Sequence, residues 1–344
     1  MGLKIKDLLE STTHTLALKD LSRKDIAIDA MNVLYQFLSI IRQQNGTPLL
    51  DSQKRITSHL SGIFYRNINL LEENIRPIYV FDGKPPELKH ETIVERKQIR
   101  ETAIEKWLDA LDRGDLVEAK KYAQASSRFT EKMISDSKML LSYMGLPYVQ
   151  APSEGEAQAS YMVRKGECWG VGSQDHDSLL FGADRLIRNL TITGRRKLPR
   201  KSTYIEVKLE LIYLEEMLKD LEISREQLVD IGILVGTDFN DGVKGIGPKT
   251  ALKLIKEHGD LESIMRVKDI LAEVPIDQIR SIFLHPEVTD EYSIEWLPLD
   301  QNKILEFLCE EHDFSQDRVK KGLERLENLS DQKKQATLFD WMRS

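Results

Sequence analysis

The alternation of short apolar runs with helical stretches is the feature that most limits the fold of this chain. Four such runs occur in the first half of the sequence, at residues 25–29, 77–81, 147–150 and 168–171. The stretches 31–42 and 53–75 between them have a helical pattern. Strands separated by helices form parallel sheets, so we predict an α/β fold with a mostly parallel central sheet flanked by helices.

Acidic side chains mark the ends of these runs. The first run ends at Asp29, and Asp82 directly follows the second. Others follow the third and fourth runs or lie further along, namely Glu154, Glu156, Asp175, Asp177 and Asp238. Ligands of open α/β sheets lie beyond the carboxyl ends of the strands, so we expect these side chains at one edge of the sheet. In an extended chain, Asp175 and Asp177 would point the same way.

Each of these seven carboxylates alone could be a turn residue or a helix cap. Gathered at one edge they would repel one another strongly, and such sets persist where hard cations occupy the site. Ligands that are all oxygen atoms favour Mg²⁺ or Mn²⁺ over zinc. Two such ions can clamp the attacking and leaving oxygens of a phosphodiester, so the set predicts metal-dependent phosphoryl transfer or hydrolysis.

A long charged segment interrupts the alternation. Residues 84–145 are helical in composition and separate two strands where a short crossover would suffice. They form either a solvated helical insertion or an arch over the active face, and we place the arch at about 84–135. From about Ser224, which could cap a helix, the pattern stays helical.

A glycine-rich turn lies within a helix, turn and helix at about 224–258. Its sequence is Gly245-Ile246-Gly247-Pro248-Lys249-Thr250. Glycine lets the backbone approach a ligand closely, and proline suits the first turn of the following helix. The exposed N–H groups there favour an anion, so the turn could hold a DNA phosphate without reading bases. The alternative is a tight turn that needs glycine for its own shape.

The charge balance excludes a chain that is basic all over. Lys and Arg total 49 against 56 Asp and Glu, which gives a net charge of −7. Seven basic and no acidic residues nevertheless lie between Arg185 and Lys201. This basic segment is either a solvated loop or a stripe that binds the DNA backbone, and we favour the stripe.

Cysteine content and hydropathy exclude other classes of protein. Two cysteines, Cys168 and Cys309, cannot form a disulfide scaffold or a four-cysteine zinc site. No apolar run approaches the roughly 18–20 residues of a membrane helix, and the N-terminus has no apolar signal core. We therefore expect an intracellular protein without membrane association.

Four motifs, in this order and spacing, resemble those of the flap endonucleases, the structure-specific 5′ nucleases of replication and repair. They read FDGKPP, APSEGEA, QDHD, and GTD followed by GIGPK, at residues 81–86, 151–157, 174–177 and 236–249. The resemblance implies a PIN-like 5′ nuclease core with a helical arch and a helix-turn-helix DNA clamp. It also implies two Mg²⁺, with Mn²⁺ as a possible substitute, one held by Asp29, Asp82, Glu154 and Glu156 and the other by Asp175, Asp177 and Asp238.

The resemblance further implies roles for residues next to the cut. Lys89 and Arg96, on the first arch helix, match residues that contact the scissile phosphate, where cations stabilise developing charge. Tyr35 matches a tyrosine that stacks on the base beside the cut. Without the resemblance, the two cations would be read as solvated helix charges and Tyr35 as a core residue.

Other positions match residues that bind DNA around the cut. Arg42, Thr57 and Arg66 match the surroundings of a pocket for a one-nucleotide 3′ flap, although Arg66 could equally be a helix-surface charge. Gly2, exposed after removal of Met1, resembles an N-terminal glycine near the active site. An extension before Gly2 is therefore expected to impair cleavage.

The last residues resemble the box that binds the sliding clamp, proliferating cell nuclear antigen. The box would lie within residues 335–342 and use Gln335, Leu338, Trp341 and Met342. Met342 departs from the second aromatic residue of the motif, but methionine adapts to irregular pockets. A free tail is the alternative. The sequence lacks the basic extension of eukaryotic relatives, so we expect an archaeal-type protein of the cytoplasm, or of the nucleus if the source is eukaryotic.

Together these observations predict a monomeric, structure-specific 5′ flap endonuclease with 5′–3′ exonuclease activity. Residues 1–330 would form one nuclease domain and residues 331–344 a flexible tail. Its substrate would be branched DNA with a 5′ flap, in Okazaki fragment maturation and base excision repair. Two alternatives stay open, a superfamily relative that cuts bubbles or four-way junctions and a non-catalytic DNA-binding clamp adaptor.

Overall fold

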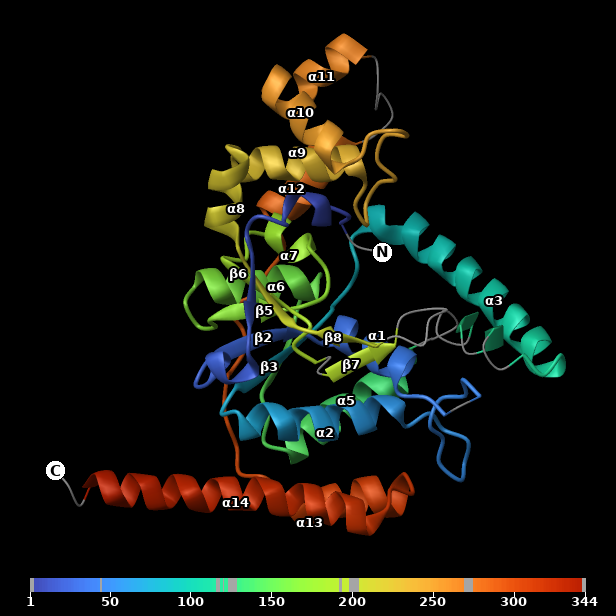
Figure 1. The fold of residues 1–344 in the computed structure, drawn as a ribbon, viewed down its shortest axis with the longest axis vertical. Helices are drawn as coiled ribbons and strands as arrows, with labels where there is room; N and C mark the ends of the chain where they lie inside the picture. The colour runs from blue at the N-terminus through green and yellow to red at the C-terminus, as the bar shows by residue number, and fades with distance from the viewer. Residues whose placement is uncertain are drawn as a thin grey trace.

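A central sheet with helices on both faces carries a projecting helix on one side and a helical unit at one end (Figure 1). The computed structural model describes residues 3–341 except 44, 116–117, 120, 123–128, 192–193, 198–203 and 269–274. For residues 90–91, 111, 194–197, 204–206, 268 and 330–341 it describes the backbone alone. None of the described helices is both long enough and apolar enough to cross a bilayer.

Seven strands form the central sheet. They are β1 (Thr13–Leu16), β2 (Asp25–Asp29), β3 (Arg76–Phe81), β4 (Tyr148–Gln150), β5 (Gly170–Gly172), β6 (Arg185–Arg188) and β9 (Leu209–Tyr213). Their order is β1-β9-β6-β5-β2-β3-β4. The five strands from β6 to β4 are parallel, and β9 runs antiparallel to both β6 and β1. The predicted mostly parallel sheet is confirmed. A separate pair consists of β7 (Gly194–Lys197) and β8 (Tyr204–Val207).

The order of the strands reverses beside β2. From β2 the chain moves to β3 and β4 on one side, and it then returns to β5 and β6 on the other. A crevice opens at such a point, beyond the carboxyl ends of the strands. Because these strands are parallel, the segments that follow residues 29, 81, 150 and 172 all start at this edge.

Side chains of the central strands alternate between two buried layers. Ile26 lies in a core shared with α1 (Ala30–Ile40), α2 (Ser58–Glu72) and α5 (Glu131–Tyr143). Ala27 faces the opposite layer, which contains α6 (Gly155–Arg164). Figure 1 shows α2 and α5 on one side of the sheet and α6 on the other. Burial on both faces explains the nearly continuous apolar runs in these strands.

A helical unit covers one end of the molecule (Figure 1). The chain enters it after α7 (Asp177–Leu180) and α8 (Leu214–Leu221). The unit contains α9 (Arg225–Val235), α10 (Pro248–His258), α11 (Leu261–Lys268) and α12 (Ile276–Leu284). The N-terminal segment packs against α10 through η1 (Lys6–Leu8), and its Leu3 and Ile5 are buried in the same core. A further short helix, η2 (Leu18–Leu21), precedes β2.

Helix α3 (His90–Asp112) projects away from the sheet after the short helix η3 (Glu87–Lys89) (Figure 1). At about 1.5 Å per residue, a helix of this length spans roughly 35 Å. It occupies the first part of the segment in which the sequence places an arch. By contrast, α5 buries Leu140 and Leu141 in the core beside the sheet, so the projecting part ends before α5.

The pattern after Ser224 predicts a chain that stays helical, and this prediction was wrong for part of the C-terminal region. Residues 286–300 form neither helix nor strand, and Pro286 and Pro298 both interrupt helical hydrogen bonding. The chain then forms α13 (Gln301–Leu305), η4 (Glu306–Glu311) and α14 (Gln316–Trp341). Helix α14 includes residues 331–341, so the backbone is helical where a flexible tail was expected.

Candidate active site and metal centre

One cavity of about 450 Å³ lies at the carboxyl edge of the sheet. All seven predicted carboxylates line it, namely Asp29, Asp82, Glu154, Glu156, Asp175, Asp177 and Asp238. Lys89, Arg96 and Tyr35 line it as well. The fold therefore brings together side chains from four strand ends, the arch and the segment after α9.

The first two carboxylates are held by backbone N–H groups. Asp29 ends β2 and caps α1, where the Asn32 N–H donates to its Oδ1 at 3.0 Å. The Gly155 N–H donates to Asp82 Oδ1 at 2.8 Å. A Cβ at Gly155 would lie 2.6 Å from that oxygen and 3.2 Å from the Val80 carbonyl oxygen, so a larger residue there would displace the Asp82 carboxylate. This gives a physical reason for the glycine in the APSEGEA motif.

Ser173 links two of the carboxylates, and sequence analysis did not identify it. It lies just after β5 and is 3% exposed. Its Oγ is 2.8 Å from Glu156 Oε1 and 3.3 Å from Asp29 Oδ2, so its hydroxyl can donate to either. Glu156 lies in the first turn of α6, and Glu154 is the N-cap of that helix. A hydroxyl residue directly after a strand, two positions before an aspartate, was the available signal.

Asp175 and Asp177 come from the loop after β5 and from the start of α7. The extended geometry assumed from their spacing was wrong, because α7 begins at Asp177. The Asp177 N–H donates to Asp175 Oδ1 at 3.4 Å. The Leu3 N–H donates to Asp177 Oδ1 at 3.1 Å, so the N-terminal segment contacts this part of the site.

Burial and mutual repulsion make these carboxylates difficult to ionise without a cation. Burial, followed by the charges of Asp82 and Asp175, raises the pKa of Asp29 to about 7. Burial and then the neighbouring carboxylates also raise the pKa of Glu156 and of Asp177 well above their usual values. A hard divalent cation would offset both effects, so the donor set fits Mg²⁺ or Mn²⁺.

Two cations from the arch reach into this acidic cavity. Lys89 Nζ lies 2.5 Å from Glu154 Oε2 and 3.5 Å from Asp238 Oδ2, and Arg96 pairs with Asp238 Oδ1. Burial alone would lower the pKa of Lys89, but the charges of Glu154 and Asp238 raise it overall. The ammonium group is therefore kept charged. The Thr92 hydroxyl also donates to the Asp238 carbonyl at 2.8 Å, a contact that the sequence did not predict.

The carboxylates share a cavity but do not yet surround an ion. Within the described ranges, no three acidic, histidine or cysteine side chains converge on one point as the ligands of a metal would. Glu154 and Asp238 are instead paired with the arch cations.

Tyr35 is half-buried on α1 and faces the same cavity. The Arg100 guanidinium lies 5.3 Å from the centre of the Tyr35 ring. The Phe129 ring packs edge-on against it, with ring centres 4.6 Å apart. Both neighbours come from the segment between β3 and α5, and the sequence gave no sign of either contact.

The three residues predicted for a 3′-flap pocket lie apart from the carboxylates. Arg42 follows α1 and donates to the Gly46 carbonyl at 2.8 Å. Thr57 is the buried N-cap of α2, and Arg66 lies on that helix, where burial lowers its pKa. The described residues that line the carboxylate cavity do not include these three.

The predicted phosphate-binding turn is open to solvent. Gly245, Gly247, Lys249 and Thr250 are all exposed, and Gly247 is the N-cap of α10. No described side chain caps the first N–H groups of α10, and Pro248 occupies its first turn. The backbone of Gly245 has a φ of +87°, a conformation that favours glycine.

The basic segment 185–201 does not form one continuous stripe. Arg188 pairs with Glu210 Oε2 at 2.7 Å and donates to the Gln174 carbonyl at 3.2 Å. Arg185 donates to the Trp169 carbonyl at 3.1 Å and lies over its ring. The stripe was therefore wrong for these two residues, because β6 lies inside the sheet beside β9. Arg195, Arg196 and Lys197 lie on β7, with their side chains outside the described residues, as are Arg200 and Lys201.

Several predicted positions at the two ends of the chain are not open to comparison. Gly2 and Met342 lie outside the described residues. Gln335, Leu338 and Trp341 belong to the backbone of α14, but their side chains lie outside the described part as well.

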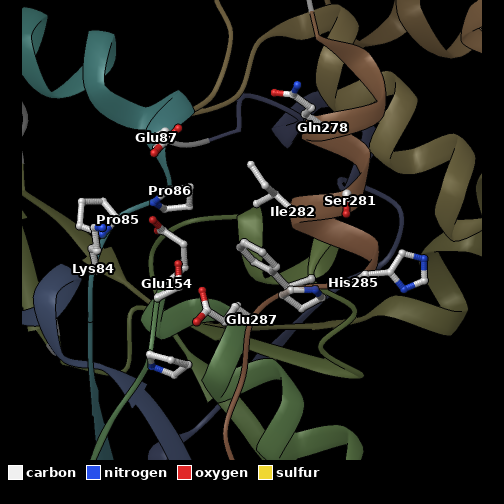
Figure 2. A pocket seen from close by; sticks show the side chains of 15 residues that line it. Lys84, Pro85, Pro86, Glu87, Glu154, Gln278, Ser281, Ile282, His285 and Glu287 are labelled. Atoms are coloured by element: carbon white, nitrogen blue, oxygen red, sulfur yellow. The ribbon is translucent and has the colours of Figure 1, made fainter.

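A second cavity, of about 630 Å³, adjoins the first, and Glu154 and Phe181 line both. Figure 2 shows Pro85 and Pro86 on one side of it and Ile282 on the other. Of the seven carboxylates, all of which are described, Glu154 alone lines this cavity. The first cavity is therefore the candidate metal centre.

Two protein families match the two regions of the chain that supply the seven carboxylates. The XPG N-terminal domain family matches residues 1–103, and the XPG I-region family matches residues 145–238. Flap endonuclease 1 of Methanosarcina acetivorans is 54% identical over 341 residues, which covers 99% of this chain and 100% of that protein. Flap endonuclease 1 of Pyrococcus furiosus is 53% identical over 345 residues, with both chains fully covered.

Solved structures agree with the sequence comparison. Flap endonuclease-1 from Methanococcus jannaschii superposes with a TM-score of 0.76 at 45% identity, covering 96% of this chain and all of that one. The catalytic core of Rad2 in complex with a DNA substrate gives a TM-score of 0.72 at 26% identity, over 96% of this chain and all of that one. With more than half of its residues identical to curated relatives over nearly its full length, this chain belongs to the flap endonuclease 1 family.

Proposed function

We propose that this chain removes 5′ flaps from branched duplex DNA by hydrolysing one phosphodiester bond at a centre that holds two Mg²⁺. Membership of the flap endonuclease family makes it a nuclease, a hydrolase of DNA phosphodiester bonds with a place in replication and repair. The observation that carries the proposal is the gathering of all seven carboxylates and two arch cations around one cavity.

The carboxylates would divide between the two ions. Asp29, Asp82, Glu154 and Glu156 would favour one, and Asp175, Asp177 and Asp238 the other. The bridge from Ser173 to Asp29 and Glu156 supports the first group, and the contact between Asp177 and Asp175 supports the second. When bound, two Mg²⁺ or Mn²⁺ would supply a more acidic water molecule and a polarised phosphate.

Lys89 and Arg96 would bind the scissile phosphate. Their positive charges would stabilise negative charge as it develops on the phosphoryl oxygens. Both are paired with Glu154 and Asp238 in this structure. They would exchange these carboxylates for phosphate oxygens as DNA and metal enter, so the resting pairs keep the two cations directed into the cavity.

Tyr35 would stack on the base beside the cut. Arg100 lies over its ring, so a base stacked on that face would displace the guanidinium. At a point distant from the cut, the turn at Gly245 and Gly247 would bind the duplex through backbone N–H groups that contact a phosphate. Arg42, Thr57 and Arg66 would surround a one-nucleotide 3′ flap, and Gly2 would lie near the active site.

The proposal includes a partner and a location. The residues Gln335, Leu338, Trp341 and Met342 would dock on a sliding clamp, with the nuclease itself monomeric. The protein would act in replication and repair in the cytoplasm, a location that the archaeal-type relatives support. Removal of the last ten residues is expected to abolish stimulation of cleavage by the clamp while basal cleavage stays unchanged.

The central experiment uses end-labelled double-flap DNA with Mg²⁺ and with chelator. Native protein should cut near the base of the flap only with metal, and Asp177→Ala should bind the DNA without cutting it. Asp277→Ala is the matched control, because the Asp277 side chain is 98% exposed and lies outside the cavity. Stronger cleavage of bubbles or four-way junctions would favour the related nucleases. Binding without any cleavage by native protein would favour the clamp adaptor.

A further inference from the structure

The N-terminal segment is attached to the carboxylate loop at a single residue, Leu3. The Leu3 N–H donates to Asp177 Oδ1 at 3.1 Å, and His176 Nδ1 lies 3.0 Å from the Leu3 carbonyl oxygen. A carbonyl oxygen only accepts, so His176 Nδ1 must carry the proton and donate it. His176 and Asp177, two consecutive residues of the QDHD motif, therefore bind the carbonyl and the N–H of Leu3.

The N-terminal segment around Leu3 is buried in the core of the helical unit. Leu3 is 2% exposed and Ile5 is fully buried, and both share a core with α9 and α10. The Leu3 Cδ1 lies 3.6 Å from the place that a Cβ would take at Gly232 in α9. The Leu3 peptide is thus fixed by apolar packing on one side and by His176 on the other.

His176 gains little else from its position. It is 6% exposed, and its Nε2 is buried without a partner among the described residues. A buried nitrogen left without a hydrogen bond destabilises the fold by about 1–3 kcal/mol. A buried apolar residue would avoid that cost, so the bond from Nδ1 to Leu3 is the contact that distinguishes histidine here.

We propose that His176 is a positioning residue for Asp177. Through the Leu3 carbonyl it holds the Leu3 N–H against Asp177 Oδ1, which leaves Oδ2 directed toward the metal. Among the described residues, Oδ2 accepts no hydrogen bond, so this oxygen is available to a cation. Mutation of a group that orients a metal ligand in this way commonly lowers metal affinity or activity by 10- to 100-fold. The inference rests on the proposed role of Asp177 as a metal ligand.

The test compares His176→Leu with His176→Asn. Asparagine can place an amide N–H near the position of Nδ1, whereas leucine fills the space without a donor. Mn²⁺ binding, followed by the loss of the electron paramagnetic resonance signal of free Mn²⁺, should weaken about tenfold in His176→Leu. Single-turnover cleavage should shift to higher Mg²⁺ by a similar factor, and His176→Asn should recover most of both losses.

The matched control is His59→Leu. His59 is also a buried histidine, 1% exposed, and both of its ring nitrogens lack partners among the described residues. The same substitution there removes no such hydrogen bond, so the affinity for Mn²⁺ should stay native. Thermal melting of every variant checks that its fold is intact.

A double-mutant comparison tests whether His176 acts through Asp177. In an Asp177→Ala background, His176→Leu should cause no further loss of Mn²⁺ affinity. A further tenfold loss there would overturn the proposal, as would native Mn²⁺ binding by His176→Leu or a failure of His176→Asn to recover it. Mn²⁺ binding is measured without DNA. Inactivity of the native protein on flaps would thus count against the proposed function and leave this comparison intact.

Discussion

Two buried acidic clusters in this molecule differ in what neutralises them. In the helical unit, Asp230 is 3% exposed, and Arg280 donates to its two oxygens at 2.7 and 2.8 Å. Arg280 also pairs with Glu262 of α11. In the carboxylate cavity, Asp29 is 5% exposed, and burial, followed by the charges of Asp82 and Asp175, raises its pKa.

The difference separates a structural cluster from a functional one. Arg280 neutralises the charge of Asp230 inside the protein, and the resulting ion pairs form a joint, a structural link between α9, α11 and α12. The cavity has seven carboxylates but only Lys89 and Arg96 as cations among its described lining. Its remaining carboxylates hold protons more readily than usual or are balanced by metal ions from outside, and this need for added positive charge is the physical basis of the proposed catalytic centre.

The largest contrast is expected from the same substitution in each cluster. Glu156→Gln should lower flap cleavage by more than about 100-fold, since even groups behind a metal ligand contribute 10- to 100-fold. The amide oxygen can still accept from Ser173 and Ser178, so the fold should persist. Glu262→Gln, on a half-exposed residue, should leave single-turnover rates within about threefold of native. Similar losses in both variants would contradict the division between the clusters.

The next contrast concerns stability. Arg280→Met should leave Asp230 buried and unpaired, and lower the free energy of unfolding by about 3–5 kcal/mol. Adding Asp230→Asn should restore most of this, because the amide oxygen can keep the bond from the Leu261 N–H without a charge. Urea unfolding measures both. A change below about 0.5 kcal/mol in Arg280→Met would show that this cluster is not the joint inferred here.

A smaller effect should appear in the pH dependence of stability without metal. The pKa of Asp29 is about 7 when folded, against about 4 when unfolded. Between these values the folded protein holds a proton that the unfolded chain has lost, so stability falls as pH rises through this window. In chelator, the stability of Asp29→Asn relative to native protein should therefore increase as the pH rises from about 4 to about 7. Parallel pH profiles for the two proteins would refute this reading of the cavity.

The carboxylates could be found from the sequence because parallel strands end at a common edge. Asp29 and Asp82 needed only the strand positions, and the turn around Gly245 needed only its local pattern. The fold class followed from the same alternation of strands and helices.

The contacts of Leu3 and Arg100 could not be found, because they depend on which distant segments meet in space. Ser173 was overlooked, although its place directly after a strand was a usable signal. Strands β1, β6 and β9 were not predicted, and the pairing of β9 with the other two joins segments that lie far apart in the sequence or follow an intervening hairpin. Arg188 was misread for the same reason, since its partner Glu210 lies on β9. Charge patterns report composition along the chain, whereas neutralisation occurs between neighbours in the fold.

The smallest expected effect separates the two glycines of the exposed turn, which is proposed to bind negative charge, whereas the cavity itself carries negative charge. Gly245 has a φ of +87°, whereas Gly247 has a φ of −92°. Apart from chain neighbours, no described atom would lie within 4 Å of a Cβ at either position. Gly245→Ala should thus cost about 1–2 kcal/mol through strain alone and weaken duplex binding, while Gly247→Ala should be tolerated by the backbone. Equal losses of affinity in fluorescence anisotropy would mean that a phosphate approaches both Cα atoms closely, and that contact rather than conformation requires glycine there.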